Sequence, residues 1–303
     1  MIAESSRQSS VVNAMTIDVE DYFQVSAFDH VVSRDQWETL ESRVCGNTER
    51  LLNIFENAGV KGTFFVLGWV ANRFPDLVRR IARAGHEIAS HGYAHRLIYE
   101  QTPAAFREDV KRAKGLLEQV SGQPVNGYRA PSYSVREDTL WAIDVLVEEG
   151  HTYDASVYPI HHDRYGMPNA PRHPYVAAGR TGTILEAPGS TIRFGSVNFP
   201  VGGGGYFRLL PYAWTRMGIA RINRAEGRPA IFYLHPWEID PDQPRFNPGL
   251  IGRFRHYRNL TKTEGRLRAL LSDFQFAPLN SVLRSSIAGA EVQSAAAPLP
   301  YLR

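Results

Sequence analysis

The chain has 303 residues, enough to bury a full hydrophobic core without staples, and 43% of its residues are hydrophobic and 21% charged. This composition excludes a largely disordered, collagen-like or disulfide-stapled protein, and the single cysteine, Cys45, fits a reducing compartment. The net charge of +3 gives no argument for nucleic acid as a partner, so none is expected.

Residues 1–10 are polar, and we expect a flexible N-terminus there. They lack the hydrophobic stretch of a secretory signal, and the chain nowhere approaches the roughly 18 consecutive apolar residues of a membrane helix. The chain as given is therefore expected to be cytoplasmic, with no membrane segment.

Strands alternate with helices along the first half of the chain. A buried strand over residues 11–17 runs into the carboxylates of Asp18, Glu20 and Asp21. The pattern then predicts helices at about 48–58, 75–84, 103–120 and 138–149, and strands at 63–67, 86–90, 125–129 and 152–155.

The second half is less regular. The segment 158–180, rich in Pro and His, is expected to be irregular, and the glycines at 202–205 to form a flexible loop. We expect strands at 183–187 and 230–234, helices at 212–226 and 264–274, a short strand near Phe276, and a flexible tail over 286–303.

Seven main strands, most of the early ones separated by helices, predict an α/β fold with a parallel sheet, open or closed into a barrel. The chain lacks both a glycine-rich dinucleotide motif after its first strand and a Walker loop, which argues against a nucleotide-binding fold. In a parallel barrel, functional groups collect at the carboxyl ends of the strands, and the polar clusters of this sequence lie there.

The segment His91-Gly-Tyr-Ala-His95 directly follows the third strand. Two imidazoles four residues apart on one helical turn point the same way and can share a metal ion. The spacing alone fits two surface histidines better, but the position after a strand and the nearby carboxylates favour a metal site.

Asp18 and Glu20 follow the first strand, and in an extended segment their side chains project to one face. Two such carboxylates repel each other unless a cation or a proton lies between them. One carboxylate could bind a metal while the other acts as a base, and a solvated acidic turn is an equal alternative.

Three further polar residues end strands. Arg129 could hold a catalytic carboxylate in a bidentate pair, or form a structural salt bridge. Asp154 and His235 suit a carboxylate–imidazole pair, in which the imidazole donates a proton to a leaving group; a rim histidine without such a role is the alternative.

Together these motifs resemble the polysaccharide deacetylase family, whose catalytic domain is the NodB homology domain. Five motifs, at 16–20, 90–95, 129–133, 154–158 and 234–235, stand in the family's order, and the likeness covers roughly residues 11–240. A closer likeness, at 18–25, 129–134 and 235–238, is to a subgroup beside bacterial exopolysaccharide loci that work with exosortase-type sorting systems. The region after about residue 160 looks like that subgroup's C-terminal extension.

The resemblance implies a distorted (β/α)7 barrel over residues 11–285, extension included. It also implies a metal-dependent hydrolase that removes N-acetyl groups from a glycan. His91 and His95 would hold a divalent metal, usually zinc in this family, and a backbone N–H near Ser132 or Tyr133 would help to stabilise the oxyanion.

The resemblance also implies catalytic and substrate-binding roles for further residues. Asp18 would be the general base, positioned by Arg129, and His235 would be the general acid, tuned by Asp154. Aromatic side chains would stack on sugar rings, unless they belong to the core; these are Tyr22, Tyr133 and Trp237.

The sequence departs from the family pattern at the first motif. Thr16-Ile-Asp18-Val-Glu20 stands where the family has T-F-D-D-G, so Val19 occupies the place of a metal ligand. We infer that Glu20 supplies the third ligand, because its side chain shares the face of Asp18. In the alternative, Asp18 binds the metal and Glu20 is the base.

Three functional hypotheses follow. The first is an N-deacetylase of an N-acetylated exopolysaccharide or its precursor. The second is an allantoinase-like amidohydrolase of small cyclic amides on the same scaffold. The third is a non-catalytic glycan-binding module that lost activity with the aspartate at position 19.

Overall fold

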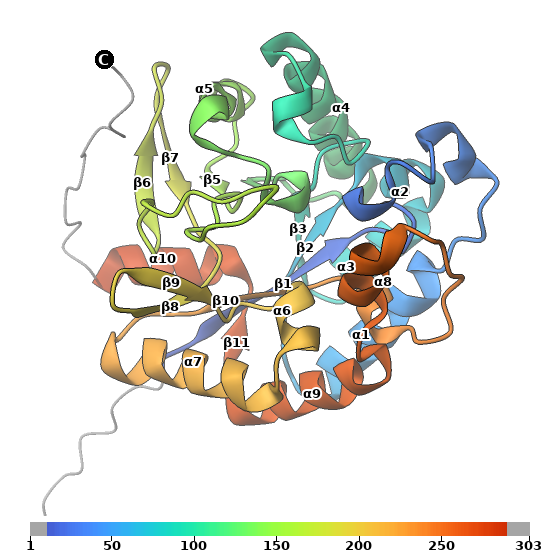
Figure 1. Cartoon of the computed structure of the whole chain (residues 1–303). Coiled ribbons are helices and arrows are strands. Elements are labelled where there is room, and N and C mark those ends of the chain that lie inside the picture. Colours follow the sequence, from blue (N-terminus) through green and yellow to red (C-terminus); the bar gives the residue numbers. More distant parts are fainter. Residues whose placement is uncertain (1–10, 290–303) are drawn as a thin grey trace, which may run out of the picture.

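The computed structural model describes residues 11–289 and is built around one curled sheet (Figure 1). Seven parallel strands lie in the order β10-β1-β2-β3-β4-β5-β7, with β6 antiparallel at the β7 edge and a further short parallel strand, β11, beside the start of β1. The seven are β1 (Asn13–Val19), β2 (Thr63–Val66), β3 (Glu87–Ser90), β4 (Gly127–Tyr128), β5 (Tyr153–Asp154), β7 (Thr183–Glu186) and β10 (Ile231–Leu234).

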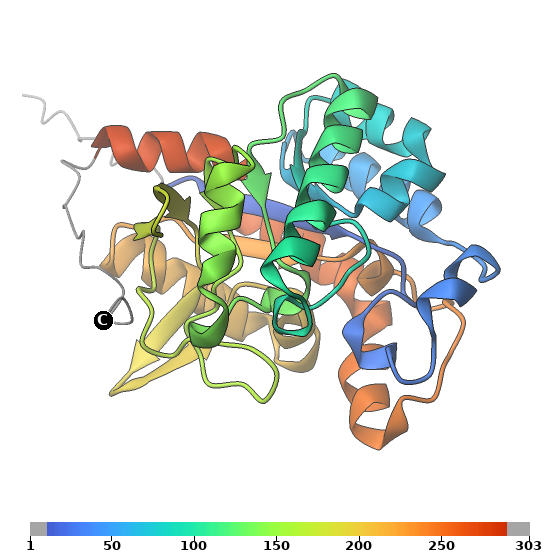
Figure 2. The ribbon, with the colours of Figure 1, turned by 90° about the horizontal axis from the view of Figure 1, so that it is seen from above.

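Helices surround this sheet (Figures 1 and 2). They are α1 (Val44–Asn57), α2 (Gly68–Arg73), α3 (Pro75–Arg83), α4 (Pro103–Ser121), α5 (Trp141–Glu148), α6 (Gly204–Leu209), α7 (Tyr212–Ala225), α8 (Gly249–Tyr257), α9 (Leu260–Asp273) and α10 (Leu279–Gly289). The remaining strands are β6 (Tyr175–Ala178), β11 (Phe276–Ala277) and a separate hairpin of β8 (Thr191–Phe194) and β9 (Val197–Pro200).

The predicted fold class is confirmed, because the seven strands expected from the sequence are the seven parallel strands of the curled half-barrel. The period of two along β1 positions the site. Ala14, Thr16 and Asp18 lie on the inner side of the sheet, whereas Ile17 and Val19 belong to the main hydrophobic core. Val19 is fully buried in that core, and its aliphatic side chain has no atom that could bind a metal.

The interior is closed at the amino ends of the strands by α10. Leu279 of this helix donates its backbone N–H to the Thr63 hydroxyl at the start of β2, at 2.7 Å. The side chains of Leu279, Val282 and Leu283 pack against small residues of the inner face such as Ala14 and Ala89. The opposite, carboxyl ends of the strands are left for the functional site.

Several elements were not predicted from the sequence: β6, the β8–β9 hairpin, α2, α6, α8 and α10. The expectation of a flexible loop at glycines 202–205 is wrong, since Gly203 pairs with Tyr233 beside β10 and α6 starts at Gly204. Gly203 has φ of +120°, and a Cβ there would lie 2.0 Å from the Tyr233 carbonyl oxygen, so only glycine fits.

The two expected loose ends fall largely outside the described residues. Residues 1–10 and 290–303 lie beyond them, and α10 runs through 286–289, the first part of the expected tail. Within residues 11–289, no helix combines the length and hydrophobicity needed to cross a bilayer.

Candidate active site

Side chains from four strands of the sheet meet at its carboxyl ends. They are Asp18 near the end of β1 and Glu20 directly after it, His91 and His95 after β3, Arg129 after β4 and His235 after β10. A cavity of about 430 Å³ opens above them, and Asp18, Glu20, His95 and His235 contribute to its wall. This volume lies in the range of small-molecule and cofactor pockets.

Asp18 is held by the buried guanidinium of Arg129. Arg129 Nη1 donates to Asp18 Oδ1 at 2.7 Å and to the Thr16 hydroxyl at 2.8 Å, while Nε donates to the Ala155 carbonyl oxygen at 3.2 Å. The predicted Arg129–carboxylate pair is thus present, but it joins one nitrogen to one oxygen and is not the bidentate pair expected. It leaves the second oxygen, Asp18 Oδ2, facing the cavity side, 3.8 Å from His235 Nε2.

Glu20, His91 and His95 form a buried cluster whose ligand atoms all lie within 4.8 Å of one another. Glu20 Oε2 is 2.8 Å from His95 Nε2 and 3.9 Å from His91 Nε2. Burial alone would raise the pKa of Glu20, but the imidazoles of His95, His235 and His91 lower it to about 2. A carboxylate facing two imidazoles is a donor set that suits a divalent transition metal.

The tautomer of His91 also fits a metal ligand. Its Nδ1 lies 2.8 Å from the Arg129 carbonyl oxygen, which can only accept, so Nδ1 carries the hydrogen. Burial lowers the pKa of His91 to about 4, so the ring is neutral and Nε2 presents a lone pair toward Glu20. The residues present therefore fit a bound divalent cation.

The expectation that the two histidines share one helical turn is wrong. The segment from His91 to Leu97 contains no helix, and His95 has φ of +48°. The turn is held from outside: the Asp109 carboxylate accepts the Tyr93 N–H at 2.7 Å, and Arg34 donates to the carbonyl oxygens of Ala94 and His95 at 2.9 and 3.1 Å.

His235 is paired with Glu238, not with Asp154. Glu238 Oε1 lies 2.7 Å from His235 Nδ1 and accepts the His235 backbone N–H at 3.1 Å. His235 Nε2 points to the site, 3.7 Å from Glu20 Oε1. Burial lowers the pKa of His235, but the charges of Glu20, Glu238 and Asp18 outweigh it and raise the pKa to about 9.

The expected tuning of His235 by Asp154 is wrong because β5, which carries Asp154, is five strands away from β10 in the sheet. Asp154 instead accepts hydrogen bonds from the Ser156 hydroxyl and, at 2.9 Å, from the Ala155 N–H. It also meets the buried carboxyl of Glu186, and burial raises the pKa of both groups. Asp154 lies outside the wall of the cavity.

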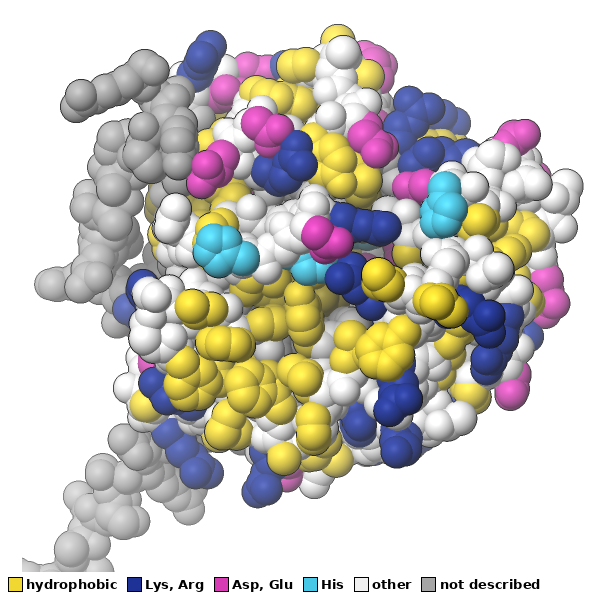
Figure 3. Space-filling view, viewed as in Figure 1, with side chains coloured by type: hydrophobic (Ala, Val, Ile, Leu, Met, Phe, Trp, Pro, Cys, Tyr) yellow, Lys and Arg dark blue, Asp and Glu magenta, His cyan; other side chains and the backbone are white. Residues whose placement is uncertain are grey.

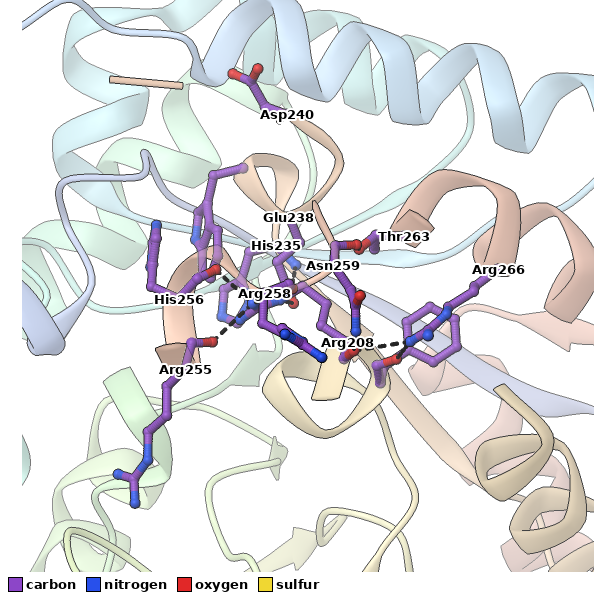
Figure 4. A network of polar contacts seen from close by, with 12 residues as sticks. Arg208, His235, Glu238, Asp240, Arg255, His256, Arg258, Asn259, Thr263 and Arg266 are labelled. Carbon is purple, nitrogen blue, oxygen red and sulfur yellow. Dashed lines mark hydrogen bonds and ion pairs between the residues drawn. The ribbon is translucent and has the colours of Figure 1, made fainter. Parts of the chain in front are cut away.

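A buried arginine supports Glu238 from the other side (Figure 4). Arg208 Nε donates to Glu238 Oε2, and Arg208 Nη1 donates to the carbonyl oxygens of Arg255 and His256 at 2.9 and 2.6 Å. Glu238 is fully buried, and Arg208, with the hydrogen bonds of His235, lowers its pKa despite that burial. The carboxylate is therefore kept ionised beside the imidazole.

Of the three aromatic residues expected to contact sugar, one is placed away from the cavity. Tyr22 is 1% exposed, donates to the Glu41 carbonyl oxygen at 3.1 Å and stacks on Phe246, so it belongs to the core. Tyr133 and Trp237 do line the cavity. Trp237 is 4% exposed and stacks on His235, and its Nε1 donates to Glu20 Oε1 at 3.2 Å.

The family resemblance also implied that a backbone N–H near Ser132 or Tyr133 would donate to the oxyanion. Both residues have φ of +52°, a left-handed conformation that non-glycine residues adopt at a cost. The Tyr133 N–H already donates to the Ala130 carbonyl oxygen at 3.0 Å, so it is engaged in the turn.

Two residues of the site, Glu238 and Arg208, were not predicted from the sequence. The spacing of Glu238 could have identified it, because it lies three residues after His235 across a turn (Pro236–Ile239) that brings residues i and i+3 together. Arg208 had no such signal, because it reaches the site from α6, a helix that the sequence did not predict.

The fold and the site define an α/β barrel protein with a Glu-His-His donor cluster, an arginine-held carboxylate and a cationic histidine. Residues 35–148 match the family model for polysaccharide deacetylase, and residues 155–284 match a model described as a domain of unknown function (DUF3473). Over residues 35–148 the chain is therefore similar to polysaccharide deacetylases.

Curated relatives match over part of their length. The peptidoglycan-N-acetylglucosamine deacetylase of Bacillus cereus is 32% identical over 98 residues, which are 32% of this chain and 36% of that protein. A chitooligosaccharide deacetylase of Rhizobium leguminosarum bv. trifolii is 30% identical over 114 residues, 38% of this chain and 49% of that protein. The chain thus spans about a third to a half of the length of these relatives.

Two solved structures extend the likeness over nearly the whole chain. A putative polysaccharide deacetylase from Mycobacterium smegmatis has a TM-score of 0.64 and 25% identity, over 94% of this chain and 93% of that chain. Puue allantoinase has a TM-score of 0.63 and 17% identity, over 93% of this chain and 92% of that chain, and shares the fold.

Proposed function

We propose that the protein is a metal-dependent N-deacetylase of glycans, with residues 11–285 as its catalytic unit. The observation that carries this proposal is the meeting of three groups in one cavity: the Glu20-His91-His95 cluster, the carboxylate of Asp18 held by Arg129, and the cationic His235. The match of residues 35–148 to the polysaccharide deacetylase family supports the same activity.

In this proposal Glu20, His91 and His95 hold the metal, and zinc is the favoured ion for a Glu-His-His set. A bound divalent cation would polarise the acetamide carbonyl and lower the pKa of a water molecule. Glu20 rather than Asp18 is the carboxylate ligand, because only Glu20 belongs to the cluster. This assignment leaves Asp18 for proton transfer.

Asp18 acts as the general base through Oδ2, since Oδ1 is fixed by Arg129. It takes a proton from the attacking water while the water oxygen bonds to the acetyl carbon. His235, whose Nδ1 is paired with the ionised carboxylate of Glu238, gives the Nε2 proton to the amine nitrogen as the C–N bond breaks. The products are acetate and a free amine on the sugar.

For the natural substrate we propose an N-acetylated exopolysaccharide or its precursor. The support is the likeness of segments 18–25 and 235–238 to the exosortase-associated subgroup, together with the separate model matched by residues 155–284. Relatives named for peptidoglycan and chitooligosaccharides make those glycans the other substrates to include in any assay.

The test is acetate release from N-acetylglucosamine oligomers, peptidoglycan and N-acetylated exopolysaccharide, with zinc or cobalt added. Wild type is compared with Asp18→Asn and His91→Ala, and with Asp242→Asn, an exposed carboxylate outside the cavity. We expect acetate from wild type and Asp242→Asn, and a loss of at least roughly a hundredfold in the other two.

Two results would overturn the proposal. Metal-loaded wild type that releases neither acetate nor amine from any glycan would exclude the deacetylase. Hydrolysis of a small cyclic amide, with all glycans left intact, would assign the same residues to cyclic-amide hydrolysis.

A further inference from the structure

Helix α8 carries the three most exposed large hydrophobic side chains of the described residues. Leu250 is 86% exposed, Ile251 71% and Phe254 55%. Of the nine residues of α8, only His256 is buried. We call Leu250, Ile251 and Phe254 the apolar stripe.

The three side chains form a single stripe because α-helical residues are about 100° apart. By this spacing the apolar stripe occupies about one quarter of the helix circumference and lies opposite the buried His256. Arg253 lies along one edge of the stripe and Arg255 along the other. An exposed apolar stripe with a cation on each side is the pattern of a helix that lies in a membrane interface.

The chain around α8 is strongly basic. From Gln243 to Thr263 there is no Asp or Glu, whereas this stretch contains four arginines and one lysine. All five are exposed, namely Arg245, Arg253, Arg255, Arg258 and Lys262. Only Arg255 meets an acidic side chain among the described residues, Asp163 at 3.4 Å, so the positive charge of the stretch is left for an anionic partner.

The orientation of α8 is fixed by the same arginine that supports the active site. Arg208 Nη1 donates to the carbonyl oxygens of Arg255 and His256 near the end of α8 (Figure 4). Ile251 and Arg255 also line the cavity, so α8 stands at its mouth. Whatever covers the apolar stripe therefore lies beside the entrance to the active site.

A second apolar element projects on the same side of the molecule. In Figure 2, α8 and the β8–β9 hairpin both extend toward the lower edge of the view, and Figure 3 shows hydrophobic side chains next to Lys and Arg over both elements. Phe194, Val197 and Phe199 of the hairpin are 44%, 45% and 39% exposed. Two projecting apolar elements suit a broad surface rather than a peptide in a groove.

We propose that α8 and its basic surroundings dock onto an anionic lipid membrane and hold the mouth of the cavity at the lipid headgroups. Cations near a negatively charged bilayer attract its headgroups, and the apolar stripe enters the boundary between headgroups and acyl chains. The proposal goes beyond the deacetylase function: it places the enzyme where a membrane-attached glycan would be presented.

The test is co-sedimentation of the full chain with lipid vesicles. Vesicles of phosphatidylglycerol and phosphatidylcholine are compared with vesicles of phosphatidylcholine alone, at low and at high salt. We expect binding to the anionic vesicles, weakened by salt because the attraction of exposed charges is screened. Two variants, Leu250→Ser/Phe254→Ser and Arg253→Glu/Arg258→Glu, should each bind at least roughly tenfold more weakly.

A matched control is Arg83→Glu/Lys111→Glu, which makes the same charge change at exposed positions on α3 and α4. It should bind like wild type, and every variant should release acetate from a soluble oligosaccharide as wild type does. Absence of binding to anionic vesicles, or equal loss in the control, would overturn the proposal. The proposal would also be overturned if the wild-type protein bound no vesicles but formed a dimer that the Leu250→Ser/Phe254→Ser variant does not form. The apolar stripe would then be an interface with a second copy of the chain. Vesicle binding and acetate release are measured separately, so failure of one is distinguished from failure of the other.

Discussion

One carboxylate oxygen of Glu238 meets His235 twice, facing the ring Nδ1 at 2.7 Å and accepting the backbone N–H at 3.1 Å. The first contact places a hydrogen on Nδ1 and orients the ring, so that Nε2 faces Asp18 and Glu20. The second fixes the backbone from which the ring projects. Glu238 therefore orients the proton donor of the proposed reaction and stabilises its charged form.

Glu238→Gln should move the alkaline limb of the pH–rate profile to lower pH. The amide keeps a hydrogen bond but loses the negative charge that helps to raise the pKa of His235 to about 9. A general acid works only while protonated, so activity is lost as pH rises through its pKa, and a lower pKa brings that loss to lower pH. We expect kcat/KM at pH 8 to fall roughly tenfold or more.

The Glu238→Gln experiment needs a fold control, because Glu238 also pairs with Arg208. Thermal unfolding of the variant supplies it. A well-folded variant whose alkaline limb is unchanged would show that Glu238 does not tune His235.

Metal loading should stabilise the protein through the Glu-His-His cluster. A ligand that binds only the folded state adds about 2.7 kcal/mol at a hundredfold excess over its Kd, so zinc should raise the melting temperature of chelator-treated protein. His95→Ala should abolish this shift and the metal content measured by elemental analysis. The control is His161→Ala, an exposed loop histidine, which should behave like wild type.

Arg129→Lys should lower kcat while leaving KM nearly unchanged. Arg129 donates to Thr16, Asp18 and the Ala155 carbonyl oxygen at once, and an ammonium group cannot reproduce this fork. We expect a loss in kcat of roughly tenfold or more, because Asp18 would be misplaced. Arg136→Lys is the control, since Arg136 also holds a carboxylate, that of Asp138, but does so at the surface and away from the cavity.

Asp154→Asn should change the pH dependence of stability and leave acetate release within a few-fold of wild type. Burial raises the pKa of both Asp154 and Glu186 above that of ordinary carboxyl groups. A carboxyl with a raised folded pKa contributes its stability below the unfolded pKa and loses it as pH rises through the folded pKa. The melting temperature of the variant relative to wild type should therefore increase from pH 5 to pH 8. A large loss of activity without a change in stability would show that Asp154 takes part in catalysis.

Gly203→Ala should destabilise the protein by about 3 kcal/mol or more. The new Cβ would lie 2.0 Å from the Tyr233 carbonyl oxygen, at a residue whose φ of +120° already excludes most side chains. Gly205→Ala is the control, because its Cβ would meet only the end of Arg208, at 3.9 Å. Equal melting temperatures for the two variants would contradict the close packing of this segment against β10.

The sequence predicted the parallel sheet because most of the early strands, which are short apolar runs, alternate with helices. It also placed Asp18 and Glu20 on one face, since the period of two along an extended strand is a local property. The pairing of Arg129 with Asp18 was implied by the family resemblance of the two motifs. These features depend on neighbours in sequence or on the common direction of parallel strands.

The features that were missed depend on tertiary arrangement. Asp154 was predicted as the partner of His235 and Glu238 was not, and only the order of the strands excludes Asp154. Helix α8 is nine residues long and contains two glycines, Gly249 and Gly252, so its sequence gives only a weak helical signal. Gly203 was read as a flexible residue because its close neighbour, Tyr233, lies thirty positions further along the chain.

The place of β1 in the sheet has a consequence for how the protein is made. β1 is synthesised early, but two of its partners are β10 and β11, which end at Leu234 and Ala277. During synthesis, β1 can pair with all of its partner strands only after nearly all of the described chain has left the ribosome. Pairings this distant in sequence also slow folding. In the proposed function, metal capture by Glu20, His91 and His95 would therefore follow synthesis of the carboxyl-terminal strands.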